Sequence, residues 1–216
     1  WTAPASPDPV IKFTRLADDG TVLGTDATVG DGRIAGLVWT GSQWITAREA
    51  SSSFSLQRWS ADGTPEGEEI RAPHAAPTLT EPGAVAWTGS VIGAVWVHDD
   101  SGAPVFMRVE PGGTPIDDPA MVLEGAGGQA AGPKVHWTGS AHALTWTAVD
   151  ASTSSLWHAQ ISPDGSLVFP PTALVTDGVA SDRGPALVWT GSELSVAWAA
   201  YSPAQSLYYN RIGWCD

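Results

Sequence analysis

The side chains best suited to binding chemistry lie in two short clusters rich in oxygen atoms. The first is His98-Asp99-Asp100, and the second is the segment TDGVASD over residues 176–182. Clusters of this kind are typical of calcium sites, and solvated turns use the same residue types. Both interpretations stay open, and no cofactor is required. The expected calcium ligands are Asp99 and Asp100 in the first cluster, or Asp177 and Asp182 in the second.

Motifs of catalysis do not occur in the sequence. It contains no G-x-S-x-G elbow, no H-E-x-x-H pair and no glycine-rich phosphate loop. His136 and His142 flank one predicted turn, but side chains alternate along strands, so the two rings need not face one zinc ion. We therefore expect a binding protein and no enzyme.

The tetrapeptide Trp-Thr-Gly-Ser sets the organisation of the chain. It begins at Trp39, Trp87, Trp137 and Trp189, at intervals of 48 (87 minus 39), 50 (137 minus 87) and 52 (189 minus 137) residues. Repeats of about 40–50 residues are typical of propellers and solenoids. An apolar run precedes each copy and an alternating run follows it. Each Thr-Gly therefore predicts a tight hairpin turn, because glycine takes positive φ without a Cβ penalty.

Further positions recur after each copy of the tetrapeptide. A second tryptophan follows at Trp96, Trp146 and Trp198, where the first copy has Arg48. A third strand carries an arginine five residues before a glycine, and a weaker fourth strand follows. The third-strand pattern occurs once more often than the others, since both ends of the chain fit it. Its arginines are Arg15, Arg58, Arg108 and Arg211, with Gln160 as the variant.

These repeats predict an all-β fold, a four-bladed β-propeller with four antiparallel strands in each repeat of about 50 residues. The domain covers residues 10–216 after a proline-rich tether over residues 1–9, and the N-terminal strand TVLGT closes the last blade. In the alternative, two chains build an eight-bladed ring. The tryptophans are expected to pack between blades. They are Trp39, Trp87, Trp137, Trp189, Trp96, Trp146 and Trp198.

The pattern VWTGS, then AW, then R...DG resembles repeats of exported bacterial β-propeller proteins that are similar in form to BNR and sialidase-like propellers. Ser162 to Phe169 comes nearest to the Asp box of that group, with Ser166 where the box has glycine. The resemblance implies the fold and leaves chemistry open. A sialidase-like glycan-processing enzyme is therefore an alternative function. It would need an arginine triad, and here the arginines recur at one repeat position.

The ligand is expected on the face that carries the longer connections, because variable loops on a rigid scaffold accumulate binding residues. We predict a non-catalytic binding module, lectin-like or an accessory subunit, whose partner is a glycan or a protein; a structural spacer is a further alternative. The expected binding residues are Arg48, Glu49, His98, Asp99, Asp100, Asp150 and Tyr201. His74, Arg183 and the second acidic cluster fall on the same face.

Composition narrows the partners further. The net charge is −13, and the only lysines are Lys12 and Lys134, so no basic patch exists for nucleic acid. No apolar run has the length of a membrane span, so membrane insertion is not expected. A start at Trp1 and the tether indicate an exported, extracellular or envelope protein. Cys215 has no internal partner and is either an inert thiol or a link to another chain, in a homo- or hetero-oligomer.

Overall fold

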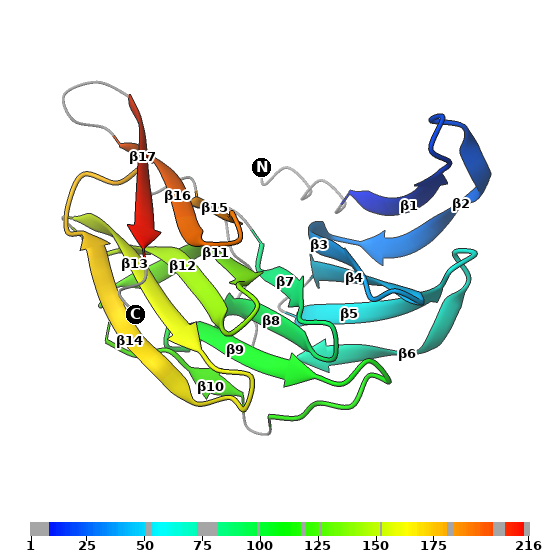
Figure 1. Ribbon diagram of the computed structural model, residues 1–216, viewed down its shortest axis with the longest axis horizontal. Coiled ribbons are helices and arrows are strands. Elements are labelled where there is room, and N and C mark those ends of the chain that lie inside the picture. The colour runs from blue at the N-terminus through cyan, green and yellow to red at the C-terminus, as the bar shows by residue number, and fades with distance from the viewer. Residues whose placement is uncertain are drawn as a thin grey trace, which may run out of the picture.

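The computed structural model describes residues 9–50, 53–72, 82–98, 100–117, 120–125, 127–151, 153–180, 184–200 and 206–213. Within these ranges seventeen strands form five small antiparallel sheets, and no helix occurs. No described segment is therefore a helix of membrane-crossing length. The sheets follow one another in an open arc, with the N-terminal sheet at one end and the C-terminal sheet at the other (Figure 1). The all-β, propeller-like prediction is confirmed.

We name the sheets N, A, B, C and D in chain order. Sheet N pairs β1 (Val10–Leu16) with β2 (Val22–Asp31). Sheet A contains β3 (Arg33–Trp39), β4 (Gln43–Ala50), β5 (Ser53–Ser60) and β6 (Pro65–Ala72). Sheet B contains β7 (Ala84–Trp87), β8 (Ile92–Val97), β9 (Pro104–Val109) and β10 (Met121–Val122). Sheet C contains β11 (Gln129–Trp137), β12 (His142–Val149), β13 (Ser154–Ile161) and β14 (Leu167–Val175). Sheet D contains β15 (Ala186–Trp189), β16 (Glu193–Ala200) and β17 (Ser206–Gly213).

The tetrapeptide turns have one chemistry in all four copies. In the first, Thr40 N donates to Gln43 O over 2.9 Å, and Gln43 N donates back to Thr40 Oγ1 over 3.0 Å. Gly41 follows with φ +97° and has no atom near its Cβ direction. The threonine therefore closes the hairpin twice, and the glycine supplies the positive φ of the turn. The other threonines that accept such a bond are Thr88, Thr138 and Thr190.

The four tryptophans of these motifs occupy equivalent places, each at the last residue of the first strand in its sheet, as predicted. They do not form the deep core, since Trp39 is 40% exposed and the other three are half-buried. The fully buried tryptophans are Trp59, Trp96 and Trp146, which lie on inner strands between neighbouring sheets. Trp198 is half-buried in the small cluster between sheets C and D.

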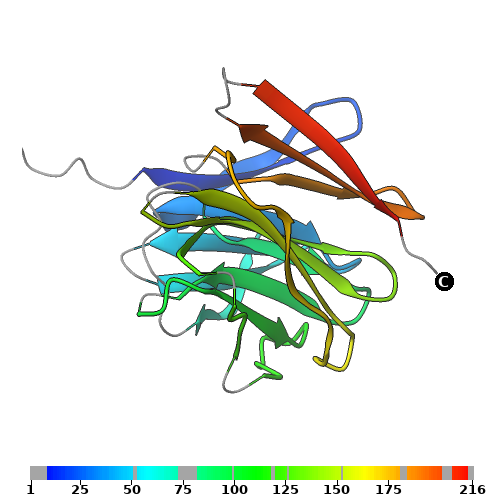
Figure 2. The same ribbon diagram turned by 90° about the vertical axis from the view of Figure 1, so that its left-hand side faces the viewer.

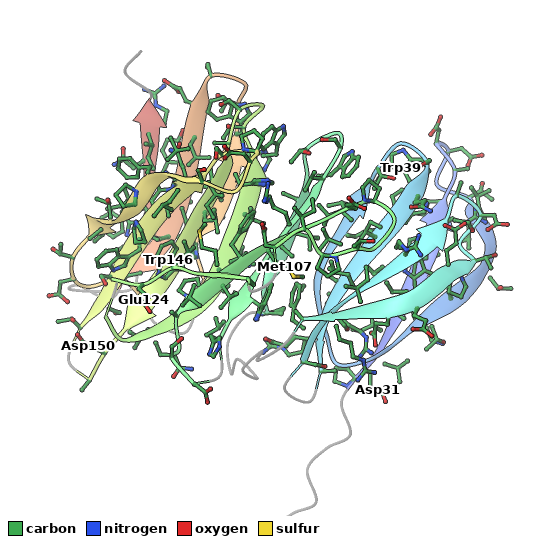
Figure 3. All side chains as sticks on the ribbon, turned by 90° about the horizontal axis from the view of Figure 1, so that it is seen from below. Asp31, Trp39, Met107, Glu124, Trp146 and Asp150 are labelled. Atoms are coloured by element: carbon green, nitrogen blue, oxygen red, sulfur yellow. The ribbon has the colours of Figure 1, made fainter. Side chains whose placement is uncertain are left out.

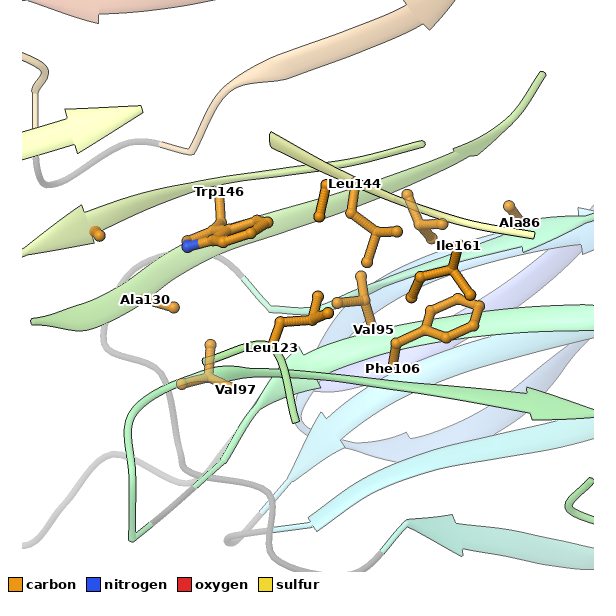
Figure 4. Close-up of a cluster of buried hydrophobic side chains, with 12 residues drawn as sticks. Ala86, Val95, Val97, Phe106, Leu123, Ala130, Leu144, Trp146 and Ile161 are labelled. Atoms are coloured by element: carbon orange, nitrogen blue, oxygen red, sulfur yellow. The ribbon is translucent and has the colours of Figure 1, made fainter. Parts of the chain in front are cut away.

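Apolar side chains fill each junction between the larger sheets. Between sheets A and B, Phe54 stacks on Trp96 with ring centroids 5.5 Å apart. Between sheets B and C, Phe106, Leu144 and Trp146 belong to one buried cluster (Figure 4). Such two-sided burial explains why the inner strands β8 and β12 are almost continuously apolar or buried, in place of a strict alternation.

The sequence predicted four complete blades with the N-terminal strand closing the last one, and the structure differs here. β2 pairs with β1, and β17 takes the third place beside β16. The β16–β17 pairing is a local hairpin with full register from Glu193 to Ala200. A local pairing closes a much shorter loop than a pairing between the two ends of the chain, which favours it entropically. Within the described residues, sheet D therefore has no fourth strand, and sheet N has only a third and a fourth strand.

Candidate functional site

A pocket of about 210 Å³ lies between sheets B and C, at the end of the strands that carries the longer connections. Three segments form it: the loop from β8 to β9, the loop from β10 to β11, and the end of β12. The lining residues are Ser101, Gly102, Ala103, Pro104, Leu123, Glu124, Gly125, Gly127, Gly128, Ala130, Trp146 and Ala148. Figure 3 shows Glu124, Trp146 and Asp150 gathered at this end of sheet C.

Backbone hydrogen bonds hold the two loops at the pocket together. Ala130 N donates to Gly102 O over 2.7 Å, which joins the β8–β9 loop to the start of β11. Leu123 N donates to Pro104 O over 2.8 Å. At Gly128, φ is +71° and an added Cβ would lie 2.3 Å from Val149 O, so only glycine lets this loop run so close to β12.

The pocket combines an apolar floor with polar groups at its rim. Leu123 and Trp146 are almost wholly buried, and the Trp146 Nε1 atom is buried with no hydrogen-bond partner in the structure. Figure 4 shows this nitrogen on the side of the ring that faces away from Leu144 and Ile161. The carboxylate of Glu124 is exposed at the rim. An apolar floor with a few polar groups is the usual composition of a small-ligand site.

Three of the predicted binding residues, His98, Asp100 and Asp150, lie close to this pocket. His98 Nδ1 accepts hydrogen bonds from the backbone N of Asp100 over 3.1 Å and of Ser101 over 3.4 Å, so its ring shapes the turn that leads into the lining. Asp150 Oδ1 accepts a hydrogen bond from Thr153 N over 2.8 Å. The backbone N of Asp150 lies 3.0 Å from the position that a Cβ atom would take on Gly128. His98 and Asp150 therefore each contact a residue of the pocket lining, Ser101 and Gly128 respectively.

Arg48 and Glu49 lie elsewhere, in the strand β4. Arg48 Nη2 forms an ion pair with Glu69 over 2.6 Å, and its Nη1 donates to Asp31 O over 2.7 Å. Arg48 therefore joins sheet N to sheet A, at the repeat position that holds Trp96 and Trp146 in the next two sheets. Glu49 is buried, with 4% of its surface exposed. Asp99, Tyr201, Asp182, His74 and Arg183 lie outside the described residues.

The calcium prediction stays untested. Asp100 and Asp177 are exposed, and Asp177 Oδ1 accepts a hydrogen bond from Gly178 N over 2.7 Å. Within the described part of the chain no group of three or more His, Cys, Asp or Glu side chains is placed to hold a metal. The predicted partners of these two residues, Asp99 and Asp182, lie outside it.

Two histidines are buried, which the sequence pattern did not reveal. Burial, with a smaller contribution from the nearby Arg108 guanidinium, lowers the pKa of His142 to about 4. The His142 ring packs against Phe106 and Trp137, with centroids 4.9 and 5.0 Å apart. Burial also lowers the pKa of His158 to about 4, although a hydrogen bond to Leu144 O over 2.8 Å opposes this shift. Both rings act as packing groups.

The residues that a sialidase-like site would need are dispersed. Arg15 and Arg108 lie at two different sheet junctions. On the open face of sheet D, Tyr209 Oη is 3.1 Å from Ser195 Oγ, and Arg211 pairs with Glu193 over 3.1 Å. A Tyr, a Glu and one Arg thus share this surface, which the sequence pattern had not placed together, but no second described arginine joins them by a hydrogen bond or ion pair in the structure.

Comparison with known proteins yields structural likeness only. No family model matches the chain, and no curated protein sequence matches it. A solved structure from a study of two prolyl endopeptidases aligns with 96% of this chain at 12% identity and a TM-score of 0.51. The chain spans about a third of that protein, 34% of its length. The GH43 endo-arabinanase from Bacillus licheniformis aligns with 83% of this chain and 72% of its own, at 12% identity and a TM-score of 0.39. At this identity the first likeness shows a shared fold and nothing of the activity.

Proposed function

We propose that this protein is a non-catalytic, extracytoplasmic binding module whose pocket between sheets B and C takes a terminal sugar residue of a glycan. The observation that carries the proposal is a pocket floored by the buried Leu123 and Trp146, with the exposed Glu124 at its rim. A small ligand with an apolar face and hydroxyl groups can pack on such a floor and donate a hydrogen bond to the carboxylate at the rim.

Size and chemistry favour a small polar ligand. A pocket of about 210 Å³ is smaller than the ~300–1,000 Å³ typical of drug-sized ligands. Its glycine-rich rim at Gly125, Gly127 and Gly128 exposes backbone groups at close range, and Glu124 accepts hydroxyl donors. Sugar rings present an apolar face and several hydroxyls, which match an apolar floor and this polar rim.

A glycan array followed by calorimetry tests this proposal. Glu124→Gln removes the charged acceptor and is expected to weaken binding about tenfold, since hydrogen bonds to charged groups contribute about 1.5–3 kcal/mol. Ser101→Trp places a bulky side chain at the rim and is expected to abolish binding. Glu110→Gln, an exposed change in the turn after β9, is the matched control and leaves binding unchanged. An array without hits, or equal affinities for all variants, would overturn the proposal.

A glycan-processing activity is the alternative, favoured only by the Tyr209, Glu193 and Arg211 surface. Incubation of the purified chain with sialosides and other glycosides, with Tyr209→Phe as the comparison, decides between the two. Turnover that Tyr209→Phe removes would establish the enzyme. For the architecture, we propose that a second chain completes the ring, in place of a four-bladed ring closed by the chain's own N-terminal strand.

A further inference from the structure

The two ends of the arc expose surfaces that every internal junction buries. On the third strand of each sheet, the residue two places before the arginine position faces the next sheet. This residue is 6% exposed in sheet N and 1% exposed in sheets A, B and C, but 63% exposed in sheet D. The residues are Phe13, Leu56, Phe106, His158 and Tyr209. Leu207, on the same face of β17 as Tyr209, is 86% exposed.

The opposite end shows the matching surface. The residue after the arginine position faces the preceding sheet, and Trp59, Val109 and Ile161 are at most 2% exposed there. In sheet N the equivalent Leu16 is 61% exposed, and its cross-strand neighbour Val22 is 55% exposed. Sheet D therefore has an uncovered forward face, and sheet N has an uncovered backward face.

An arginine clasp joins the sheets at two internal junctions, that of N with A and that of B with C. Arg15 Nη1 donates to Ala61 O over 3.1 Å, in the turn of the next sheet. Two junctions further on, Arg108 Nη1 donates to Pro163 O over 2.7 Å. In each case the guanidinium also lies over the glycine of that turn. Its nearest nitrogen is 3.1 Å from the position that a Cβ atom would take on Gly63, and 2.7 Å from that position on Gly165.

The donor and the acceptor of one further clasp are both present, and neither takes part in a junction between sheets. Arg211 occupies the arginine position of sheet D, and it is exposed and pairs within its own sheet with Glu193. Gly20 is the turn glycine of sheet N, and no atom lies within 4 Å of its Cβ direction. The carbonyl of Asp18 stands where Ala61 and Pro163 accept, two residues before the glycine.

We propose that sheet D of one chain docks head to tail on sheet N of a second copy, with Arg211 clasping the turn at Asp18 and Gly20 and with Leu207 and Tyr209 covering Leu16. The second copy fits because it carries the surface that each internal junction uses as its partner. Charge agrees as well, since Asp18 and Asp19 would face Arg211, as Asp164 faces Arg108 across its junction. In this structure the two ends stand apart across the opening of the arc (Figure 1). Such a heterologous contact closes into a ring or extends into a filament.

Light scattering coupled to size-exclusion chromatography tests the interface on the whole chain. The expected mass is twice 22.4 kDa or a higher multiple. Leu16→Asp blocks only the backward face and Tyr209→Asp blocks only the forward face. Each variant alone is expected to raise the apparent dissociation constant about tenfold or more, because central aromatic and apolar contacts dominate interfaces.

Mixing the two variants gives the decisive result. Each retains the face that the other lacks, so an equimolar mixture is expected to form a heterodimer through one intact interface. Val168→Asp, at another exposed apolar position with 61% exposure, is the matched control and keeps the wild-type mass. Circular dichroism melting of each variant shows that it is folded. A wild-type chain that stays monomeric at all concentrations would overturn the proposal, whether or not small-angle scattering shows a ring closed within one chain.

Two further outcomes also overturn it. If Tyr209→Asp dissociates the assembly and Leu16→Asp does not, sheet D pairs with another sheet D. If the mixture stays monomeric while the wild type associates, the two faces do not recognise each other. Because the pocket at Trp146 lies at the junction of sheets B and C, glycan binding by the monomeric variants keeps this test separate from the proposed function.

Discussion

Arg108 and Asp117 form an ion pair beside the junction of sheets B and C, with Nη2 and Oδ1 2.6 Å apart. The Asp117 carboxylate also accepts from Arg108 Nε and from the backbone N of Arg108, so it holds the guanidinium in the direction of Pro163. Both side chains are mostly buried, at 12% and 18% exposure. The carboxylate raises the pKa of Arg108, which keeps this clasp charged.

Replacing Arg108 is therefore expected to be costly. Arg108→Ala leaves Asp117 without its partner and removes the bond to Pro163, and breaking a buried pair costs about 3–5 kcal/mol. Since these side chains keep some contact with water, we expect the lower end of that range in urea unfolding. Arg71→Ala is the control, because Arg71 is 70% exposed, and it should change the free energy of unfolding by less than about 0.5 kcal/mol. Equal stability of both variants would show that the clasp adds nothing.

The tetrapeptide turn gives a second test, through backbone conformation alone. Gly139 has φ +95°, and no atom lies within 4 Å of the position that a Cβ atom would take. Gly139→Ala is therefore expected to lose stability only through the unfavourable backbone conformation. That conformation costs about 1–2 kcal/mol for an L-residue. Gly112 also has open space, but without positive φ, and Gly112→Ala should leave stability unchanged or slightly higher. Thermal unfolding of the two variants separates conformation from packing. A similar melting temperature for both would contradict this account of the motif.

A third test compares the stability lost when tryptophans buried to different depths are replaced by alanine. Trp96 is fully buried against Phe54, and Trp96→Ala is expected to cost about 3–5 kcal/mol, as large core aromatics do. Trp39 is 40% exposed, and Trp39→Ala should cost less than half as much. Trp87, half-buried, should fall between them. Chemical denaturation of the three variants gives the order, and a cost for Trp39 equal to that of Trp96 would overturn it.

The sequence predicted the repeat and its turns because both depend on local chemistry. The Thr-Gly hairpins, the equivalent tryptophans and the five third strands from β1 to β17 all follow from residue type and spacing. The C-terminal end of the arc was harder to predict. Two strands of the same pattern, β1 and β17, could pair with β16, and only the shorter loop that leads to β17 favours one of them.

The candidate pocket was not predicted as such, and the expected binding residues stay a prediction. His98 and Asp150 were expected on the binding face, and each contacts a residue of the pocket lining. Glu124 and Trp146 were missed as lining residues, because the pocket arises where two sheets meet, and such a meeting leaves no spacing in the sequence. The run of glycines at residues 125–128 was the one available signal, since adjacent glycines permit a close approach of backbones.

The buried histidines predict the pH dependence of stability. His142 and His158 have pKa values of about 4 in the folded chain, below the ordinary 6.5. Between these two pH values the unfolded chain therefore binds protons that the folded chain does not bind. Stability is therefore level above pH 6.5 and falls as the pH drops from 6.5 towards 4. A shift from 6.5 to about 4 corresponds to about 3 kcal/mol for each histidine.

The change His142→Phe isolates one of these contributions. Phenylalanine keeps the aromatic contacts with Phe106 and Trp137 and cannot take up a proton. We expect the variant to lose about half of the fall in unfolding free energy between pH 6.5 and 4, measured by urea titration at several pH values. His98→Phe is the comparison, because His98 is only half-buried, and this variant should keep the slope of the wild type. An unchanged slope in His142→Phe would show that the folded chain protonates His142 as readily as the unfolded chain does. The conclusion that the buried ring stays neutral would then be wrong.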